Sequence, residues 1–376
     1  MRQWPKVALG EVLKHRKEFI LLDDTEHYKR CRVQLHAKGV VLRDTVPGSD
    51  IKTKRQQVCH AGEFLVAEID AKMGGFGIVP ESLEGAVVSS HYFLFEIDGA
   101  KLDRSFLDYF IRTTGFRNQV EAQGSTNYAA IRPANVLGYQ IPLPPLAEQQ
   151  AIVSRLDTLA DKVRQVSEHL DAIEQKAAAL FLSLHYKLSG DRARILGDVL
   201  ELYEESVPVR ADSEYPQVGV RGFGGGLFPK AAVAGTETSY RAFNRLYADA
   251  LVLSQVKGWE GALALCPPEL AGMYVSPEYR TFRCVPSEAT PGYIGELVRT
   301  PWFWNLLQDA TRGVGARRER TRPEQFLNIE LPMPPQDKQR KVVEILDRQA
   351  HLRARHTTIR QANDALIPAT LERVFA

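Results

Sequence analysis

The sequence contains 376 residues, a length that corresponds to two or three ordinary domains and excludes peptide hormones and small disulfide-stapled scaffolds. Hydrophobic residues make up 44% and charged residues 25% of the chain, which is the composition of a soluble globular protein rather than a disordered or fibrous one. The 48 Lys and Arg nearly cancel the 46 Asp and Glu, so the net charge of +2 neither requires nor excludes a polyanionic partner.

Signals for targeting and for metal binding are weak. No stretch approaches the roughly 18 apolar residues of a membrane span, and no signal-peptide pattern follows the first residues, so we expect a cytoplasmic protein. Without any Cys-x-x-Cys pair, the four cysteines are predicted to be reduced and buried: Cys31, Cys59, Cys266 and Cys284. His36 and His60 could join Cys31 and Cys59 around zinc, but adjacent Cys59 and His60 would point to opposite faces of a strand, so we expect no metal site.

In chain order, the first clear elements are two strands and a helix. Residues 64–69 and 86–95 are short, β-branched and aromatic runs, which predict strands. Residues 105–123 carry apolar side chains at helical spacing and predict a single helix. A Pro-rich stretch at residues 141–145 then ends this mixed segment, so the fold class is predicted to be α+β.

The next element is a long helix from residue 146 to about residue 188, which at 1.5 Å per residue is about 60 Å long. Its apolar residues alternate in steps of four and three, the pattern of a coiled-coil seam: Ile152, Leu156, Leu159, Val163, Val166, Leu170, Ile173, Ala177, Leu180 and Leu184. After residue 335, Ile345, Leu352, Ile359 and Leu366 recur at sevens, whereas the other seam row is polar and holds Gln349, His356 and Asn363. We expect two long antiparallel helices forming a coiled coil, with Pro368 bending the second one or ending it early.

The chain also contains an internal repeat. An offset of 187 residues aligns residues 9–13, Leu-Gly-Glu-Val-Leu, with residues 196–200, Leu-Gly-Asp-Val-Leu, and an offset of 190 aligns residues 141–145 with 331–335. One offset with a single three-residue insertion over about 150 residues disfavours two unrelated domains. The predicted map is a globular copy at 1–145, a spacer helix at 146–190, a second copy at 191–335 and a second helix at 336–376.

Residues 141–150, Ile-Pro-Leu-Pro-Pro-Leu-Ala-Glu-Gln-Gln, open the long helix, and residues 68–80, Glu-Ile-Asp-Ala-Lys-Met-Gly-Gly-Phe-Gly-Ile-Val-Pro, form a second motif. With the repeat, these motifs strongly resemble the specificity subunits of Type I restriction-modification systems, over residues 6 to about 375. The resemblance implies two repeated target recognition domains, each reading one half of a bipartite DNA target, joined by helices that set the spacing. The second helix start departs from the signature, with Gln-Asp-Lys-Gln-Arg at residues 336–340, so the two partner sites are not expected to be equal.

The resemblance implies that the catalytic chemistry resides on partner subunits of a prokaryotic complex. Two modification subunits would dock on the helices and methylate adenine from S-adenosylmethionine, while restriction and translocase subunits would use ATP and Mg²⁺; this chain would be non-catalytic and carry no cofactor. The residues agree, because neither a phosphate-binding Gly-x-x-x-x-Gly-Lys-Ser/Thr loop nor an Asn/Asp-Pro-Pro-aromatic tetrapeptide occurs. The glycine-rich residues 222–227 are interpreted as a tight turn.

Two alternatives were weighed against this interpretation. A metal nuclease built on Glu68, Asp70 and Lys72 is disfavoured, because the aligned residues of the second copy are Gln255, Lys257 and Trp259. The second alternative is a duplicated coiled-coil scaffold that binds proteins without reading DNA. The affinity of the chain for random duplex DNA, and the fall of this affinity with salt, would distinguish a DNA-reading subunit from such a scaffold.

Residues that contact DNA are sought among cations on loops, because Lys and Arg neutralise phosphates. The candidates near two equivalent strands are Lys52, Lys54, Arg55, Arg241 and Arg245, and those after another strand are Lys72 and Lys257. The arginine cluster in the three-residue insertion and its flanks aligns in sequence with a neutral polar segment of the first copy. The two copies are therefore predicted to read different bases at these positions. The residues concerned are Arg312, Arg317, Arg318, Arg320, Asn127 and Tyr128. The competing interpretation of these clusters is a solvated surface loop.

Overall fold

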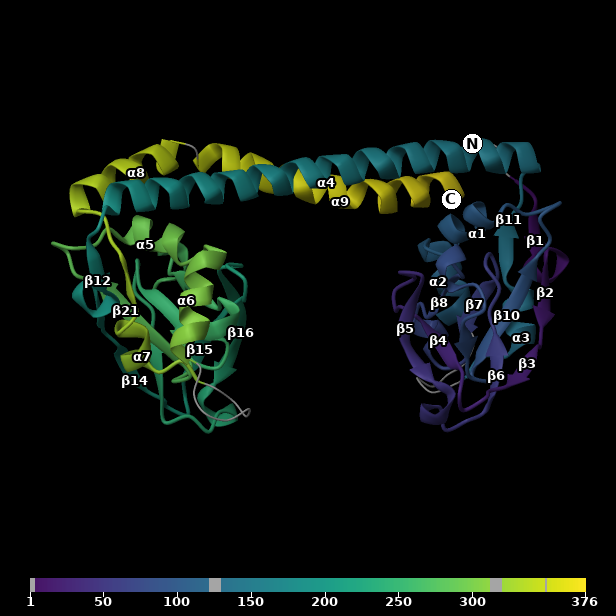
Figure 1. The fold of residues 1–376 in the computed structure, drawn as a ribbon, viewed down its shortest axis with the longest axis horizontal. Coiled ribbons are helices and arrows are strands. Elements are labelled where there is room, and N and C mark those ends of the chain that lie inside the picture. Colours follow the sequence, from purple (N-terminus) through teal and green to yellow (C-terminus); the bar gives the residue numbers. More distant parts are fainter. Residues whose placement is uncertain (1–3, 122–129, 312–319, 349) are drawn as a thin grey trace. The chain divides into compact units, whose positions relative to one another are not determined.

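The computed structural model describes residues 4–121, 130–311, 320–348 and 350–376, and its contacts divide the chain into two units. The first unit comprises Met1–Leu170 with Thr357–Ala376, and the second comprises Asp171–His356. Each unit combines mainly antiparallel sheets with short helices, which confirms the predicted α+β class (Figure 1). Within the described ranges, no helix has both the length and the apolarity that crossing a membrane requires.

The first unit contains three sheets that enclose two cores. Strand β7 (Phe64–Ala67) separates these cores: Phe64 and Val66 pack with the helices, whereas Leu65 and Ala67 face a core shared with β4 and β5. Alternate side chains of a strand point to opposite faces, so a strand covered on both sides is apolar throughout. The five-stranded sheet has the order β3 (Phe19–Leu21), β6 (Arg55–Val58), β9 (Val87–Val88), β4 (His27–Val33), β5 (Val40–Pro47). The four-stranded sheet has the order β2 (Leu13–Arg16), β10 (Tyr92–Ile97), β7, β8 (Phe76–Ile78), and β1 (Lys6–Ala8) pairs with β11 (Gln140–Pro142).

The second unit repeats this topology strand for strand, which confirms the internal repeat. Its five-stranded sheet has the order β14 (Glu205–Pro208), β17 (Ala242–Arg245), β20 (Tyr274–Val275), β15 (Glu214–Val220), β16 (Leu227–Ala234). Its four-stranded sheet has the order β13 (Leu200–Leu202), β21 (Tyr279–Cys284), β18 (Leu251–Ser254), β19 (Leu263–Leu265), and β12 (Ala193–Ile195) pairs with β22 (Glu330–Pro332).

Two sequence-based predictions of single elements were wrong. The helix expected at 105–123 is two helices, α1 (Arg104–Phe110) and α2 (Thr114–Glu121), because the Thr113 hydroxyl donates to the Phe110 carbonyl at 2.7 Å and accepts from the Phe116 amide at 3.2 Å. Thr300 makes the same two bonds between α5 (Pro291–Leu297) and α6 (Pro301–Thr311). The strand expected at 86–95 is likewise two, since β9 and β10 belong to different sheets. Each unit adds one further short helix, α3 (Pro133–Gly138) or α7 (Pro323–Leu327).

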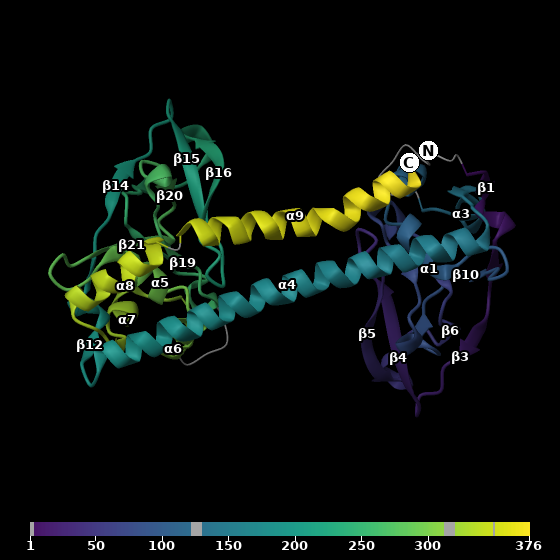
Figure 2. The same ribbon diagram turned by 90° about the horizontal axis from the view of Figure 1, so that it is seen from above.

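The long helices are α4 (Leu146–Ser189), α8 (Gln336–Arg348) and α9 (Ala350–Phe375). In the first unit, the start of α4 and the end of α9 pack antiparallel, as predicted: the Asn363 side chain donates to the Val163 carbonyl at 2.8 Å, and Leu371 shares a core with Leu156 (Figure 2). The expected apolar seam is wrong in part, because Val166, Ile359 and Leu366 are exposed. Asn363 also donates to the Ser167 hydroxyl at 3.0 Å, so the polar seam residue fixes this register. Pro368 lies inside α9, and the expectation of an early helix end was wrong.

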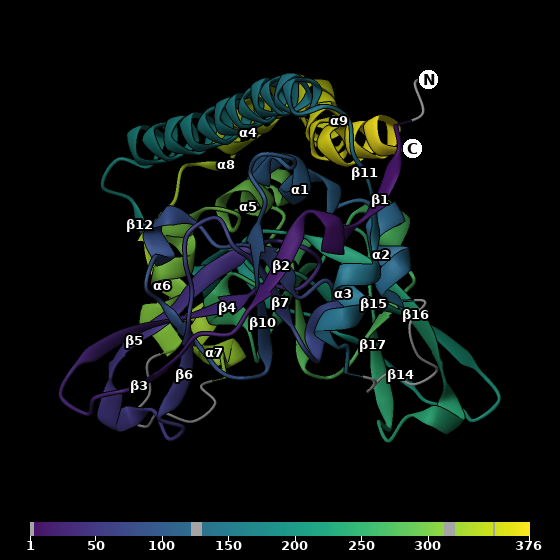
Figure 3. The same ribbon diagram turned by 90° about the vertical axis from the view of Figure 1, so that its right-hand side faces the viewer.

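Each unit holds its long helix through one buried glutamine. Gln149 accepts from the Asp103 amide at 2.8 Å and donates to the carbonyls of Lys101 and Pro144, each at 2.8 Å. Gln339 makes the three equivalent bonds in the second unit, to the Thr290 amide and to the carbonyls of Glu288 and Pro334. In the first unit α1 lies between the sheets and the long helices (Figures 1 and 3), so this anchor joins sheet, short helix and long helix.

Candidate nucleic-acid interface

The hairpin loop of each five-stranded sheet folds back onto a short 3₁₀ helix. In the first unit, the amides of His36 and Ala37 donate to the carbonyls of Met73 and Gly74 at 2.7 and 2.9 Å, next to the 3₁₀ helix Asp70–Met73. In the second unit, the amides of Phe223 and Gly224 donate to the carbonyls of Glu260 and Gly261 at 2.7 and 3.3 Å, next to the 3₁₀ helix Gly258–Glu260. These position-matched bonds form a surface in each unit that we call the loop platform: residues 34–39 and 69–74 in the first unit, and residues 221–226 and 256–261 in the second.

Both platforms hold residues in the left-handed region of backbone conformation. His36 and Ala37 have φ of 61° and 55°, and Phe223 has φ of 53°. Residues other than glycine rarely adopt this backbone conformation, because it costs them on the order of 1 kcal/mol or more each. Of the four such residues in the described ranges, three lie in the platforms, at matching positions of the repeat. The strain is therefore a property of the shared frame, and the hydrogen bonds between the loop amides and the 3₁₀ segments hold the loop tips in this conformation.

Further segments converge on the platforms. The Ile131 amide donates to the Glu68 carbonyl at 3.1 Å, and the Thr321 amide donates to the Gln255 carbonyl at 2.8 Å. Lys72 and Lys257 lie within the platform 3₁₀ regions, whereas Arg320 forms an ion pair at 3.2 Å with Glu278, a residue outside the platform whose carbonyl accepts from the Gln255 amide. Lys257 is 3.8 Å from the Glu260 carboxylate. The structure thus places Lys72 and Lys257 on the two platforms and Arg320 on a neighbouring segment; the remaining candidates of these clusters lie outside the described residues, namely Asn127, Tyr128, Arg312, Arg317 and Arg318.

The other predicted cations lie on the five-stranded sheets rather than on the platforms. Lys54 and Arg241 immediately precede the equivalent strands β6 and β17. Lys54 pairs with the Asp24 carboxylate and donates to the Gly48 carbonyl at 2.6 Å, so its charge is already partly compensated. The Arg55 guanidinium lies 4.4 Å from the centroid of the Phe19 ring, and Lys52, Arg241 and Arg245 have exposed side chains. In the first unit, β3 and β6 lie at the end away from α4 (Figures 1 and 3).

Sequence reasoning sought cations and missed the exposed apolar side chains of the platforms. Ile69 and its counterpart Val256 are both exposed, directly after the equivalent strands β7 and β18. Phe223 and Trp259 add two exposed aromatic rings in the second platform. A phenylalanine inside the glycine-rich residues 222–227 was the available signal, because a turn in solvent does not need an aromatic ring.

The residues considered for metal chemistry have other partners. The thiols of Cys31 and Cys59 lie 3.6 Å apart in a buried core, whereas the His60 ring contacts the Glu84 carboxylate at 2.7 Å. The Glu68 carboxylate, one of the residues considered for a nuclease metal site, contacts the His91 ring at 2.8 Å. In the ranges that the structure describes, no three His, Cys, Asp or Glu side chains gather as a metal site would require.

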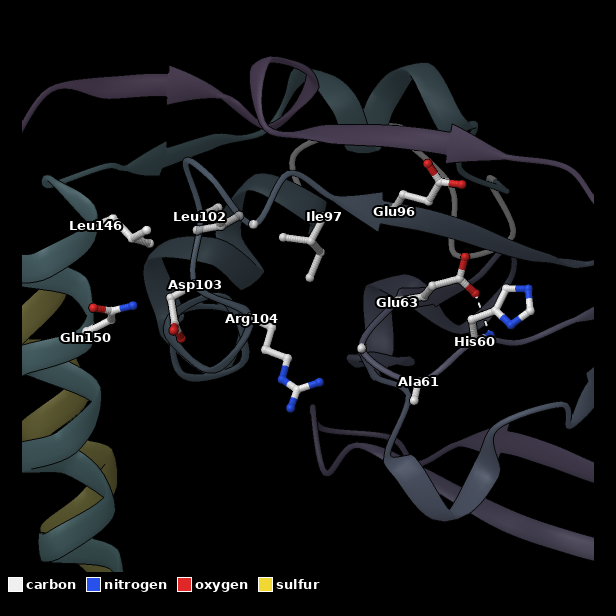
Figure 4. Close-up of a pocket in the computed structure, with 12 residues that line it drawn as sticks. His60, Ala61, Glu63, Glu96, Ile97, Leu102, Asp103, Arg104, Leu146 and Gln150 are labelled. Atoms are coloured by element: carbon white, nitrogen blue, oxygen red, sulfur yellow. Dashed lines mark hydrogen bonds between the residues drawn. The ribbon is translucent and has the colours of Figure 1, made fainter.

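A cavity of about 490 Å³ in the first unit lies where β10, α1 and α4 meet (Figure 4). Glu63, Glu96 and Asp103 line it together with His60 and Arg104. Glu63 accepts from the Arg16 guanidinium at 2.8 Å, and this bond raises the pKa of Arg16. The Glu84 carboxylate likewise raises the pKa of His60. Because carboxylates predominate in its wall, this cavity is not suited to a phosphate backbone, which leaves the platforms and the β6 and β17 strands as candidate surfaces.

Comparisons with known proteins place these observations in a family context. Residues 1–175 match the family model described as the Type I restriction modification DNA specificity domain. Similar curated proteins are the MjaVIII specificity subunit of Methanocaldococcus jannaschii, 26% identical over 193 residues, and the EcoKI specificity subunit of Escherichia coli K12, 34% identical over 71 residues. These alignments cover 48% and 19% of this chain, but only 45% and 15% of the relatives' own lengths.

A solved structure shares the fold over nearly the full length. It is a chain described in connection with complex assembly and conformational transition of the type I R-M system, and it is 19% identical. The match covers 99% of this chain and 95% of that one, with a TM-score of 0.58. The likeness therefore extends to both units and to the long helices, beyond the residues that the family model matches.

Proposed function

We propose that this chain is a specificity subunit of a Type I restriction-modification system, like the proteins it is similar to, and that it reads a bipartite DNA target for a methylating and restricting complex. Each unit would read one half of the target through its loop platform. The cations on β6 and β17 would contact phosphates, which supply affinity without sequence information.

The observation that carries this proposal is one frame with two sets of side chains. The platforms share their backbone hydrogen bonds and their strained φ values, yet His36 corresponds to Phe223, Asp70 to Lys257 and Lys72 to Trp259. A repeated frame presents two similar surfaces to the two halves of a duplex target, while different side chains select different bases. An asymmetric split target follows from this arrangement.

The partners belong to the proposal as well. In the second unit Ile173 and Leu180 of α4 and Ile345 of α8 have exposed side chains, and in the first unit so does Val166, seven residues before Ile173. Apolar side chains exposed at intervals of seven suit a further helix or subunit, so we place the docking of two adenine methyltransferase subunits along the long helices. S-adenosylmethionine would be held by these subunits, and ATP and Mg²⁺ by restriction and translocase subunits. This chain contributes recognition and spacing, and no catalytic group.

Single-molecule methylome sequencing tests the proposal. A host would express this chain together with the methyltransferase subunit encoded beside it, and a second host would express the methyltransferase alone. Adenine methylation at one split motif only in the presence of this chain is the expected result. Absence of any new motif, with both proteins associated, would favour the scaffold alternative; affinity for random duplex DNA that does not fall with salt would favour it too.

A further inference from the structure

The second loop platform carries an exposed aromatic patch, defined here as Phe223, Val256 and Trp259. The Phe223 side chain is 73% exposed, Val256 is 45% exposed and Trp259 is 41% exposed. Scattered single apolar residues are normal on a protein surface, but these three lie on two segments that backbone hydrogen bonds hold together, from the Phe223 amide to the Glu260 carbonyl and from the Gly224 amide to the Gly261 carbonyl. Such patches mark interaction sites.

The phenyl ring of Phe223 is held rigidly although it is exposed. Its amide is fixed to the Glu260 carbonyl, and its ring packs edge-to-face on Trp304 with centroids 6.1 Å apart. The Trp304 indole donates to the Val298 carbonyl at 2.8 Å and lies so close to Gly261 that a Cβ there would approach it to 2.7 Å. A ring presented on fixed backbone and fixed neighbours loses little conformational entropy on binding.

Folding stability does not account for a phenylalanine at this position. Glycine or asparagine adopts positive φ at lower cost, and a ring that is mostly exposed gains little from burial. The strained backbone conformation at Phe223 thus presents an aromatic ring to solvent without a matching gain in folding stability.

Duplex DNA is the occupant that the surroundings favour. Arg221, whose guanidinium lies 4.6 Å from the centroid of the Phe228 ring, and Lys257 belong to the same platform as Phe223 and Trp259. Cations at the rim would contact phosphates while apolar rings reach base edges, where the thymine methyl group is the main apolar feature of the major groove. In the first unit, His36 and Lys72 occupy the frame positions of Phe223 and Trp259 and offer polar contacts instead.

We propose that Phe223 and Trp259 are specificity-determining residues that contact bases in the half-target read by the second unit. This inference rests on the proposed function and deepens it: the second platform presents two aromatic rings at frame positions where the first platform has His36 and Lys72, although Leu35, Ile69 and Met73 are exposed apolar residues of the first platform. The repeat itself supplies the test variants, Phe223→His and Trp259→Lys, because the first unit accommodates these residues at the same frame positions and His36 has the same positive φ.

The experiment compares methylomes of hosts that express the methyltransferase with the wild-type chain or with either variant. We expect methylation at the original motif to fall about tenfold or more, with altered base preference confined to one half of the target. Leu202→Ala, which removes an exposed leucine from β13 of the same unit, is the matched control and should leave the motif unchanged. His36→Phe should alter only the other half.

The outcomes separate this inference from the proposed function. A wild-type chain that directs no methylation overturns both. A wild-type chain that directs methylation, with both variants bound to the methyltransferase and modifying the original motif at the wild-type rate, overturns only the inference. Should a variant lose all methylation, Phe223→Asn decides, since asparagine tolerates positive φ and removes only the ring: altered or lost recognition with an unchanged unfolding midpoint supports the base contact, and restored wild-type recognition refutes it.

Discussion

Replacing Gln149 by alanine is expected to destabilise the first unit and to leave the second unaffected. The Gln149 side chain is 0% exposed and makes three hydrogen bonds, so truncation strands the Asp103 amide and the carbonyls of Lys101 and Pro144. Each unsatisfied buried group costs about 1 kcal/mol or more, and the vacated space adds a packing loss. We therefore expect a loss of about 3 kcal/mol, or a fall in the urea midpoint of about 1 M or more for a slope near 2 kcal/mol per M.

Urea unfolding followed by tryptophan fluorescence measures this loss unit by unit. In a Trp4→Phe background, all remaining tryptophans, Trp259, Trp302 and Trp304, report on the second unit. There Gln339→Ala should lower the midpoint by a similar amount, whereas Gln149→Ala should not move it. With Trp4 restored, Gln149→Ala should shift the Trp4 component, and Gln150→Ala, its exposed neighbour, should shift neither. Equal shifts from Gln149→Ala in both components would refute the assignment of one anchor to each unit.

Three further predictions concern pH, spacing and affinity. Burial lowers the pKa of His185 to about 4 from its ordinary 6.5, so the unfolded state binds the proton first as pH falls. The second unit should therefore keep its full stability above pH 6.5 and lose up to about 3 kcal/mol as the pH falls to 4. Urea unfolding midpoints of the His185→Phe variant should not show this decline. A heptad added to both α4 and α9 lengthens each by about 10 Å, so the methylome should show the unread gap widened by about three base pairs and both half-sequences unchanged; an unaltered gap contradicts the spacer role. Arg241→Ala should weaken binding to all duplexes alike and reduce the salt slope by about one, while Lys54→Ala, whose charge is already paired with Asp24, should have the smaller effect in a salt titration.

The repeat and the long helices could be predicted because they rest on periodicity. An offset of 187 residues pairs strands that the structure places at equivalent positions of two identical topologies, and the apolar steps of four and three give α4 without ambiguity. Local breaks could not be predicted in the same way. A threonine inside an amphipathic run looks helical, and only the packed structure shows that Thr113 and Thr300 each end one helix and begin the next.

The candidate interface was predictable in part. Cations can be found by charge, and of those predicted Lys72 and Lys257 lie at matching places of the two platforms. The platform itself depends on contacts between loops far apart in the sequence, such as the bond from the Phe223 amide to the Glu260 carbonyl, which no local pattern encodes. Exposure was visible only in part: the glycine-rich surroundings of Phe223 indicate a turn, whereas nothing in the sequence around Trp259 marks its ring as exposed.

The two units share their buried frame contacts and differ in the side chains that the platforms present to solvent. Frame contacts are kept in both: Gln149 and Gln339 form the same three bonds, and the hairpin loops dock through the same amides. Buried contacts tolerate little change, since each lost partner costs on the order of 1 kcal/mol, whereas side chains on the solvent face of a platform vary at little cost to stability. The platforms keep their backbone frame, with His36 and Phe223 both at positive φ, and differ in these side chains, which is what the proposed reading of two different half-targets requires.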